Sequence, residues 1–198
     1  MQEHDCATYE GEDDNIPKAS ENALQEGEIY FIDGSASIDP ETGEKHVGMA
    51  QVRMEEDSYE MIVQKRLPSH FHAQAAELVA LIEALHAAKG CSVTIYSDSA
   101  YATTTVHSRL SEWRRRGFRQ ADGSPVQHAT LLNELIEALA EPSVVAVMKC
   151  QAHTNNTDAI SLGNVAADAA AKDAAYFNIP STIECIANTH YTTSRRRV

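Results

Sequence analysis

One run of eleven residues, 28–38, limits the folds open to this 198-residue chain more than any other part of it. The run is rich in β-branched and aromatic side chains, and both of its alternating faces are largely apolar, which is typical of a central strand covered on two sides. An acid, Asp33, lies on the same face as Phe31. Because an unpaired buried carboxylate costs several kcal/mol or becomes protonated, Asp33 needs a cation. The run predicts a metal-binding acid on a core strand, with Gly34 leaving room for whatever approaches it and Ser35 adding a hydroxyl.

Length and composition restrict the class of protein. The chain fits one domain of about 150 residues with tails. Its apolar runs are far shorter than the roughly 20 residues of a membrane span, and its acidic N-terminus lacks the pattern of a secretory signal. The four cysteines have neither disulfide nor zinc-site spacing, which is typical of reduced thiols. We therefore expect an intracellular protein, cytoplasmic or nuclear, that is not secreted and does not bind a membrane.

The net charge of −13 argues at first against a nucleic-acid partner, since phosphate binding normally comes with a basic surface. Residues 1–28 carry −8 of it, which leaves −5 for the rest of the chain. Residues 1–27 have no periodicity and are expected to form an acidic disordered leader, either an interaction tail or a passive solubiliser. Residues 178–198 are expected to form a C-terminal tail, so that the domain spans residues 28–177.

Three short apolar segments start the expected domain. Residues 47–54 and 59–66 follow the first strand, and turn-forming residues separate the three. They predict an antiparallel meander.

The period then changes to that of a helix. Residues 72–89 have apolar side chains at spacings of three and four, and Gly90 is placed to end the helix in the left-handed conformation. Glu77 lies within a stripe of small apolar side chains, whereas Glu83 lies off it. An acid in a stripe that packs on a sheet is unusual, which favours a functional role for Glu77. The stripe consists of Ala73, Ala80, Leu81, Ala84 and Ala88.

A third candidate acid follows the fourth predicted strand, residues 92–97. Taken alone, Asp98 fits a cap for a helix that starts near Ala100 as well as it fits a metal ligand. A helical crossover makes this strand parallel to the first, however. Asp98 and Asp33 then lie side by side at the carboxyl ends of adjacent strands, where open α/β sheets bind ligands.

Basic side chains gather in residues 106–119, a mixed helical stretch with five arginines in eleven positions and the only tryptophan. Arginines here either follow phosphates or solvate a protruding helix. We favour phosphate contact. Residues 127–140 then predict a structural amphipathic helix, and residues 144–148 predict a buried fifth strand.

The last candidate residues follow that fifth strand. His153 lies in a polar loop, where a histidine is usually only solvated, but the end of its strand should point toward the same crevice. Gly163 and Asn164 are expected to open a final alanine-rich helix, residues 165–176. Asp168 shares a face of that helix with Val165, Ala171 and Ala175, so small side chains would let the acid approach the sheet, whereas Asp173 faces solvent.

In this order the parts resemble the type 1 ribonuclease H family over residues 28–177, and most of all the ribonuclease H domain of gammaretroviral, endogenous retrovirus-like reverse transcriptases. A single Asp-Gly-Ser is a weak match, but four motifs in order are specific. The motifs are His72 to Leu78, Tyr96 to Ala102, Trp113 to Gly117 and Gly163 to Asp168.

The resemblance implies a fold and a set of site residues. The fold is α/β, a ribonuclease H-like mixed five-stranded sheet in which strands 1–3 form an antiparallel meander and strands 4–5 are parallel, with helices on both faces. Two Mg²⁺ ions, with Mn²⁺ as substitute, are expected at four catalytic acids, assisted by the loop histidine. These residues are Asp33, Glu77, Asp98, Asp168 and His153. The expected substrate-binding residues are Ser35, Gln74, Ser99, Tyr101, Arg114, Arg115, Arg116 and Asn164.

The implied reaction is endonucleolytic hydrolysis of the RNA strand of RNA/DNA hybrids, in which two ions about 4 Å apart activate the water and stabilise the leaving oxygen. Gln74 and Asn164 are expected to contact 2′-hydroxyls in the minor groove. One alternative is a captured retroelement domain that serves as a nucleic-acid-binding or protein-interaction module. Another is a different nuclease or strand-transfer enzyme of the same fold. Four costly acids kept in one crevice favour the first reading.

Overall fold

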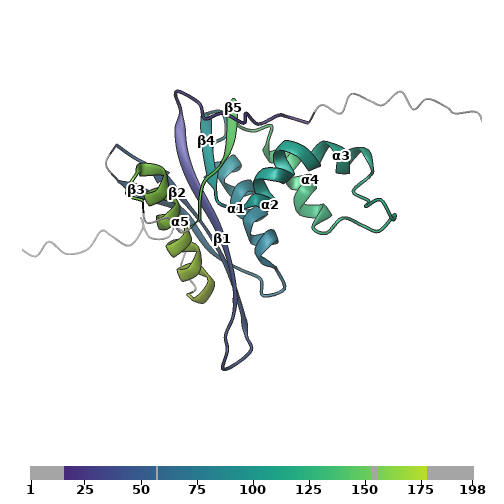
Figure 1. The fold of residues 1–198 in the computed structure, drawn as a ribbon, viewed down its shortest axis with the longest axis horizontal. Coiled ribbons are helices and arrows are strands. Elements are labelled where there is room, and N and C mark those ends of the chain that lie inside the picture. Colours follow the sequence, from purple (N-terminus) through teal and green to yellow (C-terminus); the bar gives the residue numbers. More distant parts are fainter. Residues whose placement is uncertain (1–15, 57, 153–155, 178–198) are drawn as a thin grey trace, which may run out of the picture.

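A computed structural model describes residues 16–56, 58–152 and 156–177, which form one mixed sheet with helices on both faces (Figure 1). The strand order is β3-β2-β1-β4-β5, with β1, β2 and β3 antiparallel to one another and β4 and β5 parallel to β1. This is the sheet that the sequence predicted. The strands are β1 (Glu28–Ile38), β2 (Lys45–Met54), β3 (Tyr59–Leu67), β4 (Ser92–Ser97) and β5 (Val144–Lys149).

The helices form two layers. Figure 1 shows α5 against one face of the sheet, α1 and α4 on the other, and the run from α2 to α3 leading away from the sheet. The helices are α1 (Ala73–Ala87), α2 (Ala100–Thr104), the π-helical turn η1 (Thr105–Arg109), α3 (Leu110–Arg115), α4 (Ala129–Ala138) and α5 (Ala159–Tyr176).

The central strand separates two groups of buried side chains. Tyr30 and Ile32 pack with Leu78 and Leu81 of α1, whereas Phe31 packs with Ala167 of α5. Alternate residues of β1 therefore pack against the helix layers on opposite faces of the sheet, as its two apolar faces predicted.

The predicted stripe of α1 lies against the sheet except at one position. Ala73 is exposed because it occupies the first turn of the helix, ahead of the point where α1 meets the sheet. Ala80, Leu81, Ala84 and Ala88 are fully buried.

Gly34 brings α1 close to the central strand. A Cβ at this position would lie 2.5 Å from the Glu77 backbone nitrogen and 2.6 Å from the Ala76 carbonyl carbon. The expectation that Gly34 makes room for a ligand is therefore corrected, because the space beside it is filled by the backbone of α1.

Part of the expected leader lies on the sheet. Residue Ser20 forms a parallel bridge with Ala146 at the outer edge of β5, and Ile16 is buried in the core. The expectation that residues 1–27 are disordered is thus corrected for residues 16–27, because a strand edge with unpaired backbone groups offered them partners. Residues 1–15 and 178–198 lie outside the described residues.

Two helices differ from their predicted extents. α5 begins at Ala159 rather than after Asn164, since the Asp158 side chain caps it by accepting from the Ser161 backbone N–H at 3.0 Å. The stretch predicted as helical at residues 106–119 begins within η1, and α3 ends at Arg115. In the part of the chain that the structure describes, no helix has the length and apolar character needed to cross a membrane.

Candidate metal centre

Three acids from three different elements meet at the carboxyl end of the central strands. Asp33 lies on β1, Glu77 on α1 and Asp98 directly after β4. One carboxylate oxygen from each lies within 4.8 Å of the other two, an arrangement that can hold a metal ion. The predicted neighbourhood of these three acids is therefore present.

Sheet register and helix packing place these acids. β1 and β4 are parallel with Ile32 opposite Ser97, so the next residues, Asp33 and Asp98, leave the pair side by side. Glu77 lies on α1, which packs directly against β1 because Gly34 has no side chain. Backbone packing thus holds the three acids together before any ligand binds.

Burial and the charges of neighbouring acids disfavour ionisation of Asp33 and Glu77. Burial, with Asp98 and Asp168 adding to it, raises the pKa of Asp33 from 3.8 to about 7. Burial raises the pKa of Glu77 from 4.5 to about 9, and the charges of Asp33 and Asp98 add to the effect. Among the described residues, none of the three acids forms an ion pair with a lysine or arginine within 4.0 Å, and the buried Glu77 Oε2 has no hydrogen-bond partner. No lysine or arginine of the described residues therefore neutralises these three acids by direct contact, and the site favours a bound cation.

A hard divalent cation suits this set of ligands. Carboxylate oxygens are the ligands that Mg²⁺ and Mn²⁺ favour, and a bound ion lowers the pKa of its ligands while it satisfies the orphaned Glu77 oxygen. The residues present therefore fit the expected metal.

Asn164 lies beside the cluster, in contact with Asp98. Its side chain is only 3% exposed, and its Nδ2 donates to Asp98 Oδ2 at 3.1 Å. The Cys150 thiol donates to Asn164 Oδ1 at 3.3 Å, and burial raises the pKa of Cys150 to about 11, which keeps the proton on sulfur. The amide thus links Cys150 to Asp98 and orients the Asp98 carboxylate, and its expected contact with substrate stays a prediction.

The fourth predicted acid lies at the margin of the cluster. Asp168 is partly buried on α5 and is not part of the group of three whose oxygens lie within 4.8 Å. Its Oδ2 accepts from Lys172 Nζ, one turn later, at 2.7 Å. On the helix face expected to carry Asp168, Ala171 and Ala175 are fully buried as predicted, whereas Val165 is 46% exposed. Asp173 is exposed as predicted.

The serines beside the cluster have different surroundings. Ser99 caps α2, where its Oγ accepts from the Ala102 backbone N–H at 3.2 Å, which shows that Asp98 does not serve as the cap. Ser35 is half-buried on β1, two residues after Asp33. His153 lies outside the described residues.

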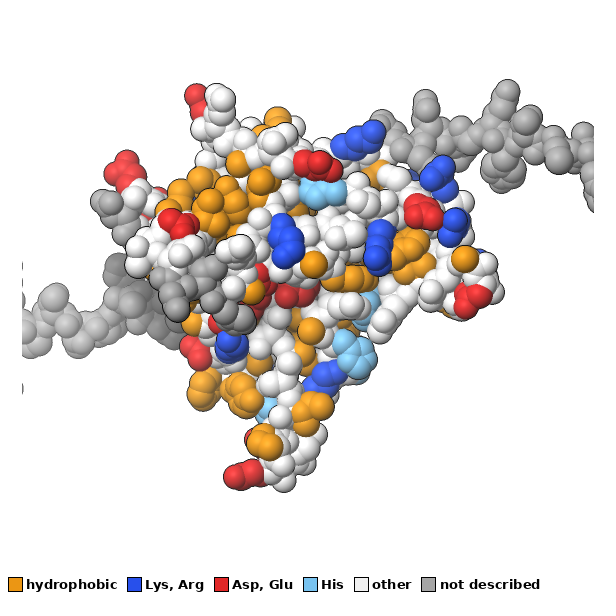
Figure 2. All heavy atoms as spheres, viewed as in Figure 1, with side chains coloured by type: hydrophobic (Ala, Val, Ile, Leu, Met, Phe, Trp, Pro, Cys, Tyr) orange, Lys and Arg blue, Asp and Glu red, His pale blue; other side chains and the backbone are white. Residues whose placement is uncertain are grey.

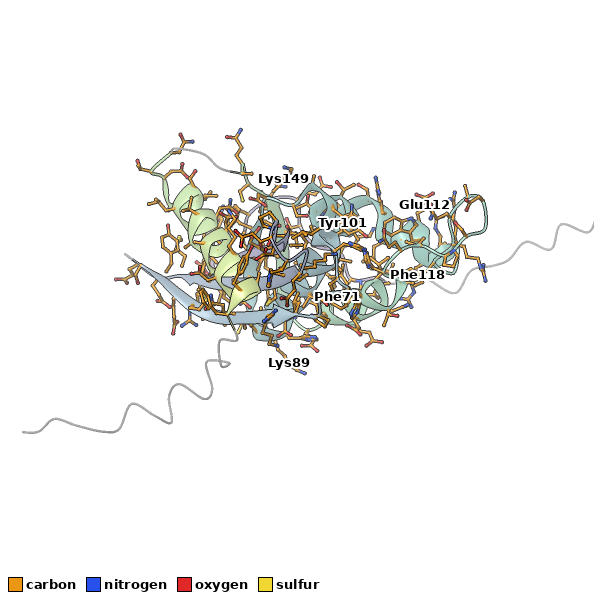
Figure 3. The ribbon with its side chains drawn as sticks, turned by 90° about the horizontal axis from the view of Figure 1, so that it is seen from below. Phe71, Lys89, Tyr101, Glu112, Phe118 and Lys149 are labelled. Atoms are coloured by element: carbon orange, nitrogen blue, oxygen red, sulfur yellow. The ribbon has the colours of Figure 1, made fainter. Side chains whose placement is uncertain are left out.

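A polar pocket of about 230 Å³ lies between α1, α2 and the arginine segment, residues 109–119. Gln74 and Tyr101 line it on one side and Arg109 and Trp113 on another, with the Arg109 guanidinium 5.7 Å from the centre of the Trp113 ring. Figure 3 shows Tyr101 close to the sheet, with Glu112 and Phe118 farther out along the same run of helices. The pocket therefore lies between α3 and the two elements, α1 and α2, that carry Gln74 and Tyr101.

The predicted arginines lie at the far end of this run. Arg114, Arg115 and Arg116 are all exposed, and Arg116 forms an ion pair with Glu112 at 3.0 Å. Figure 2 shows Lys and Arg side chains over this part of the molecule, with acidic ones between them. The segment presents positive charge to solvent but has no fixed partner for Arg114 or Arg115 among the described residues.

The family model for RNase H matches residues 25–176. The chain belongs to the ribonuclease H family. This ribonuclease H domain is 36% identical to the Gag-Pol polyprotein of baboon endogenous virus (strain M7) over 74% of the chain and 8% of that protein. It is 34% identical to the Gag-Pol polyprotein of koala retrovirus over 87% of the chain and 10% of that protein. The chain thus spans about a tenth of the length of these relatives.

Solved structures agree with the family assignment. The solution structure of the PFV RNase H domain is 25% identical with a TM-score of 0.63, over 75% of this chain and 94% of that one. The crystal structure of LC9-RNase H1, a type 1 RNase H, is 19% identical with a TM-score of 0.59, over 81% and 80% of the two chains, and shares the fold.

Sequence reasoning missed two residues of the ribonuclease H site. Lys172 lies four positions after Asp168, a spacing that places ion-pair partners together on a helix and could have indicated the contact. Cys150 gave no such signal, because its relation to Asn164 depends on how β5 and α5 pack.

Proposed function

We propose that this domain hydrolyses the RNA strand of RNA/DNA hybrids by a two-metal-ion mechanism at Asp33, Glu77, Asp98 and Asp168. The observation that carries the proposal is the convergence of three acids that have no basic partner among the described residues, two of which, Asp33 and Glu77, have raised pKa values. A foamy viral protease-reverse transcriptase, 22% identical and of the same fold, has been solved in complex with an RNA/DNA hybrid. Membership of the ribonuclease H family supports the same reaction for this chain.

Metal ions supply, when bound, an activated water and stabilisation of the leaving oxygen in phosphodiester hydrolysis. The four acids hold them: Asp33 and Glu77 at the buried end, Asp98 and Asp168 toward solvent. Asn164 is a positioning residue that fixes the Asp98 carboxylate through its Nδ2. His153 is proposed to assist water activation or product release.

Substrate contacts follow the pocket and the arginine segment. Gln74 and Tyr101 line the pocket between α1 and the arginine segment and are proposed to meet the hybrid in its minor groove, where Gln74 can bond to 2′-hydroxyls. Arg114, Arg115 and Arg116 are proposed to meet phosphates farther along the duplex. Ser35 and Ser99 flank the acids and are proposed to lie near the scissile strand.

The test is cleavage of a hybrid labelled on either strand, at low salt, with Mg²⁺, with Mn²⁺ or with chelator. We expect shortened RNA and intact DNA with either ion and no cleavage with chelator. Double-stranded DNA and double-stranded RNA of the same sequence are the controls for substrate class. Purified protein that binds the hybrid but cuts neither strand would instead support a captured module that only binds nucleic acid. Cleavage of the DNA strand would indicate a different nuclease of this fold.

A further inference from the structure

Lys172 is the only basic side chain that the structure, within its described residues, pairs with an acid of the proposed metal site. Its Nζ lies 2.7 Å from Asp168 Oδ2, and the Lys172 side chain is 54% exposed. A cation that binds one ligand of a metal site and remains open to solvent can leave that ligand at low cost. Exposed pairs of this kind contribute little to stability, so the contact has no evident role in holding the fold together.

The charge of Lys172 acts on more than its direct partner. Its hydrogen bond to Asp168 raises the pKa of Lys172, and the charges of Asp33 and Asp98 add to that effect. In the other direction, Lys172 opposes the rise in the pKa of Asp33. The ammonium therefore partly neutralises the cluster from its solvent side.

We propose that Lys172 is a resident counter-cation of the carboxylate cluster that divalent ions must displace from Asp168. The inference rests on the proposed function, because it concerns the same site. In the absence of ions, Lys172 occupies Asp168 and holds it apart from Asp33, Glu77 and Asp98. When an ion binds, the ammonium moves to solvent and Asp168 joins the other three. Lys172 thus sets the ion concentration at which the four-acid site is completed.

Competition predicts a definite change in affinity. A ligand that must first break an internal pair binds more weakly by the factor that the pair imposes. Lys172→Gln should therefore bind Mn²⁺ about two- to fivefold more tightly in calorimetric titrations at low ionic strength without substrate. Lys172→Arg should behave as the wild type or bind more weakly, because it keeps the positive charge.

The matched control is Lys65→Gln. Lys65 forms the same kind of pair, 2.7 Å from Glu83, and its loss changes the net charge equally without touching the cluster. We expect less than about a twofold change in Mn²⁺ affinity, since long-range charge effects are screened. Thermal unfolding without ions checks that both variants fold.

Asp168→Asn and Lys172→Gln together form a double-mutant cycle. In the Asp168→Asn background Lys172→Gln should no longer tighten Mn²⁺ binding, because the pair it relieves is absent. An unchanged or weaker affinity in Lys172→Gln, an equal gain in Lys65→Gln, or a gain that persists with Asp168→Asn would each overturn the role of Lys172. Wild-type protein that binds no Mn²⁺ would overturn the proposed function itself, so the two failures are distinguishable.

Discussion

The carboxylate cluster and the arginine segment, residues 109–119, are both charged, yet they are held in opposite ways. The acids are fixed by the register of β1 and β4 and by the close approach of α1 over Gly34. The arginines of α3 extend into solvent at the end of a chain of short helices. In the cluster, packing holds like charges close together. In the arginine segment, the charged side chains are exposed and can change conformation when a partner binds. Changes in the cluster should therefore act on chemistry and stability, and changes in the segment on affinity alone.

The largest effect is expected from Asp33→Asn. Asparagine keeps the shape of the side chain but removes the charge that holds a divalent ion, so hybrid cleavage should be lost. Rates measured with Mg²⁺ at saturating hybrid test this. Asp173→Asn, an exposed acid on α5, is the control and should cut at the wild-type rate. Substantial cleavage by Asp33→Asn would remove this acid from the proposed mechanism.

A large loss of stability is expected from Gly34→Ala. The added methyl group would meet the backbone of α1 at 2.5 Å, so the helix must move, at a cost of about 1–3 kcal/mol or more. Urea unfolding measures the loss, and calorimetry should show weaker Mn²⁺ binding because Glu77 moves with the helix.

Gly27→Ala separates these two effects. Its methyl group would meet the Ser92 carbonyl oxygen at 2.4 Å, at the opposite end of β1 from the cluster. It should destabilise the protein but leave Mn²⁺ affinity near that of the wild type. Equal loss of affinity in both variants would show that packing at Gly34 has no special relation to the site.

Much of the contrast between the carboxylate cluster and the arginine segment was predictable from the sequence, because it depends on local pattern. The strand around Asp33 and the stripe around Glu77 are periodic, and a helical crossover fixes β4 parallel to β1. What failed depends on tertiary packing. The apolar pattern could not show that the α1 backbone packs against Gly34, that Asn164 contacts Asp98, or that Ser20 pairs with the edge of β5. The start of α5 was missed because Asp158 looked like part of a polar loop.

The stability of the metal-free protein should fall as pH rises. The pKa values of Asp33 and Glu77 are raised in the folded state to about 7 and about 9, so the folded protein binds more protons than the unfolded chain above pH 4. Their contribution is thus fully present at low pH and is lost as pH rises through 7 and then 9, by a few kcal/mol in all.

Urea unfolding with chelator between pH 5 and 9 measures that slope. Millimolar Mg²⁺ should recover much of the loss, because it binds the folded state alone. Asp33→Asn should flatten the slope below about pH 7, whereas Asp173→Asn should not. Stability that rises with pH over this range would show that the acids are already neutralised by some other group.

The smallest effect on the folded protein is expected in the arginine segment. Replacing Arg114, Arg115 and Arg116 by Gln should change the free energy of unfolding by about 0.5 kcal/mol or less, because all three are exposed. Hybrid affinity should nevertheless fall, and the slope of log affinity against log salt should flatten by roughly 2 to 3, the number of phosphate contacts removed. Filter binding in chelator from low to moderate salt measures both.

A triple variant at Lys18, Lys65 and Lys89 removes the same charge outside α3 and should keep most of the slope. An unchanged slope in the arginine variant would mean that these side chains only solvate a protruding helix, and that the hybrid is held by the pocket of Gln74 and Tyr101 alone.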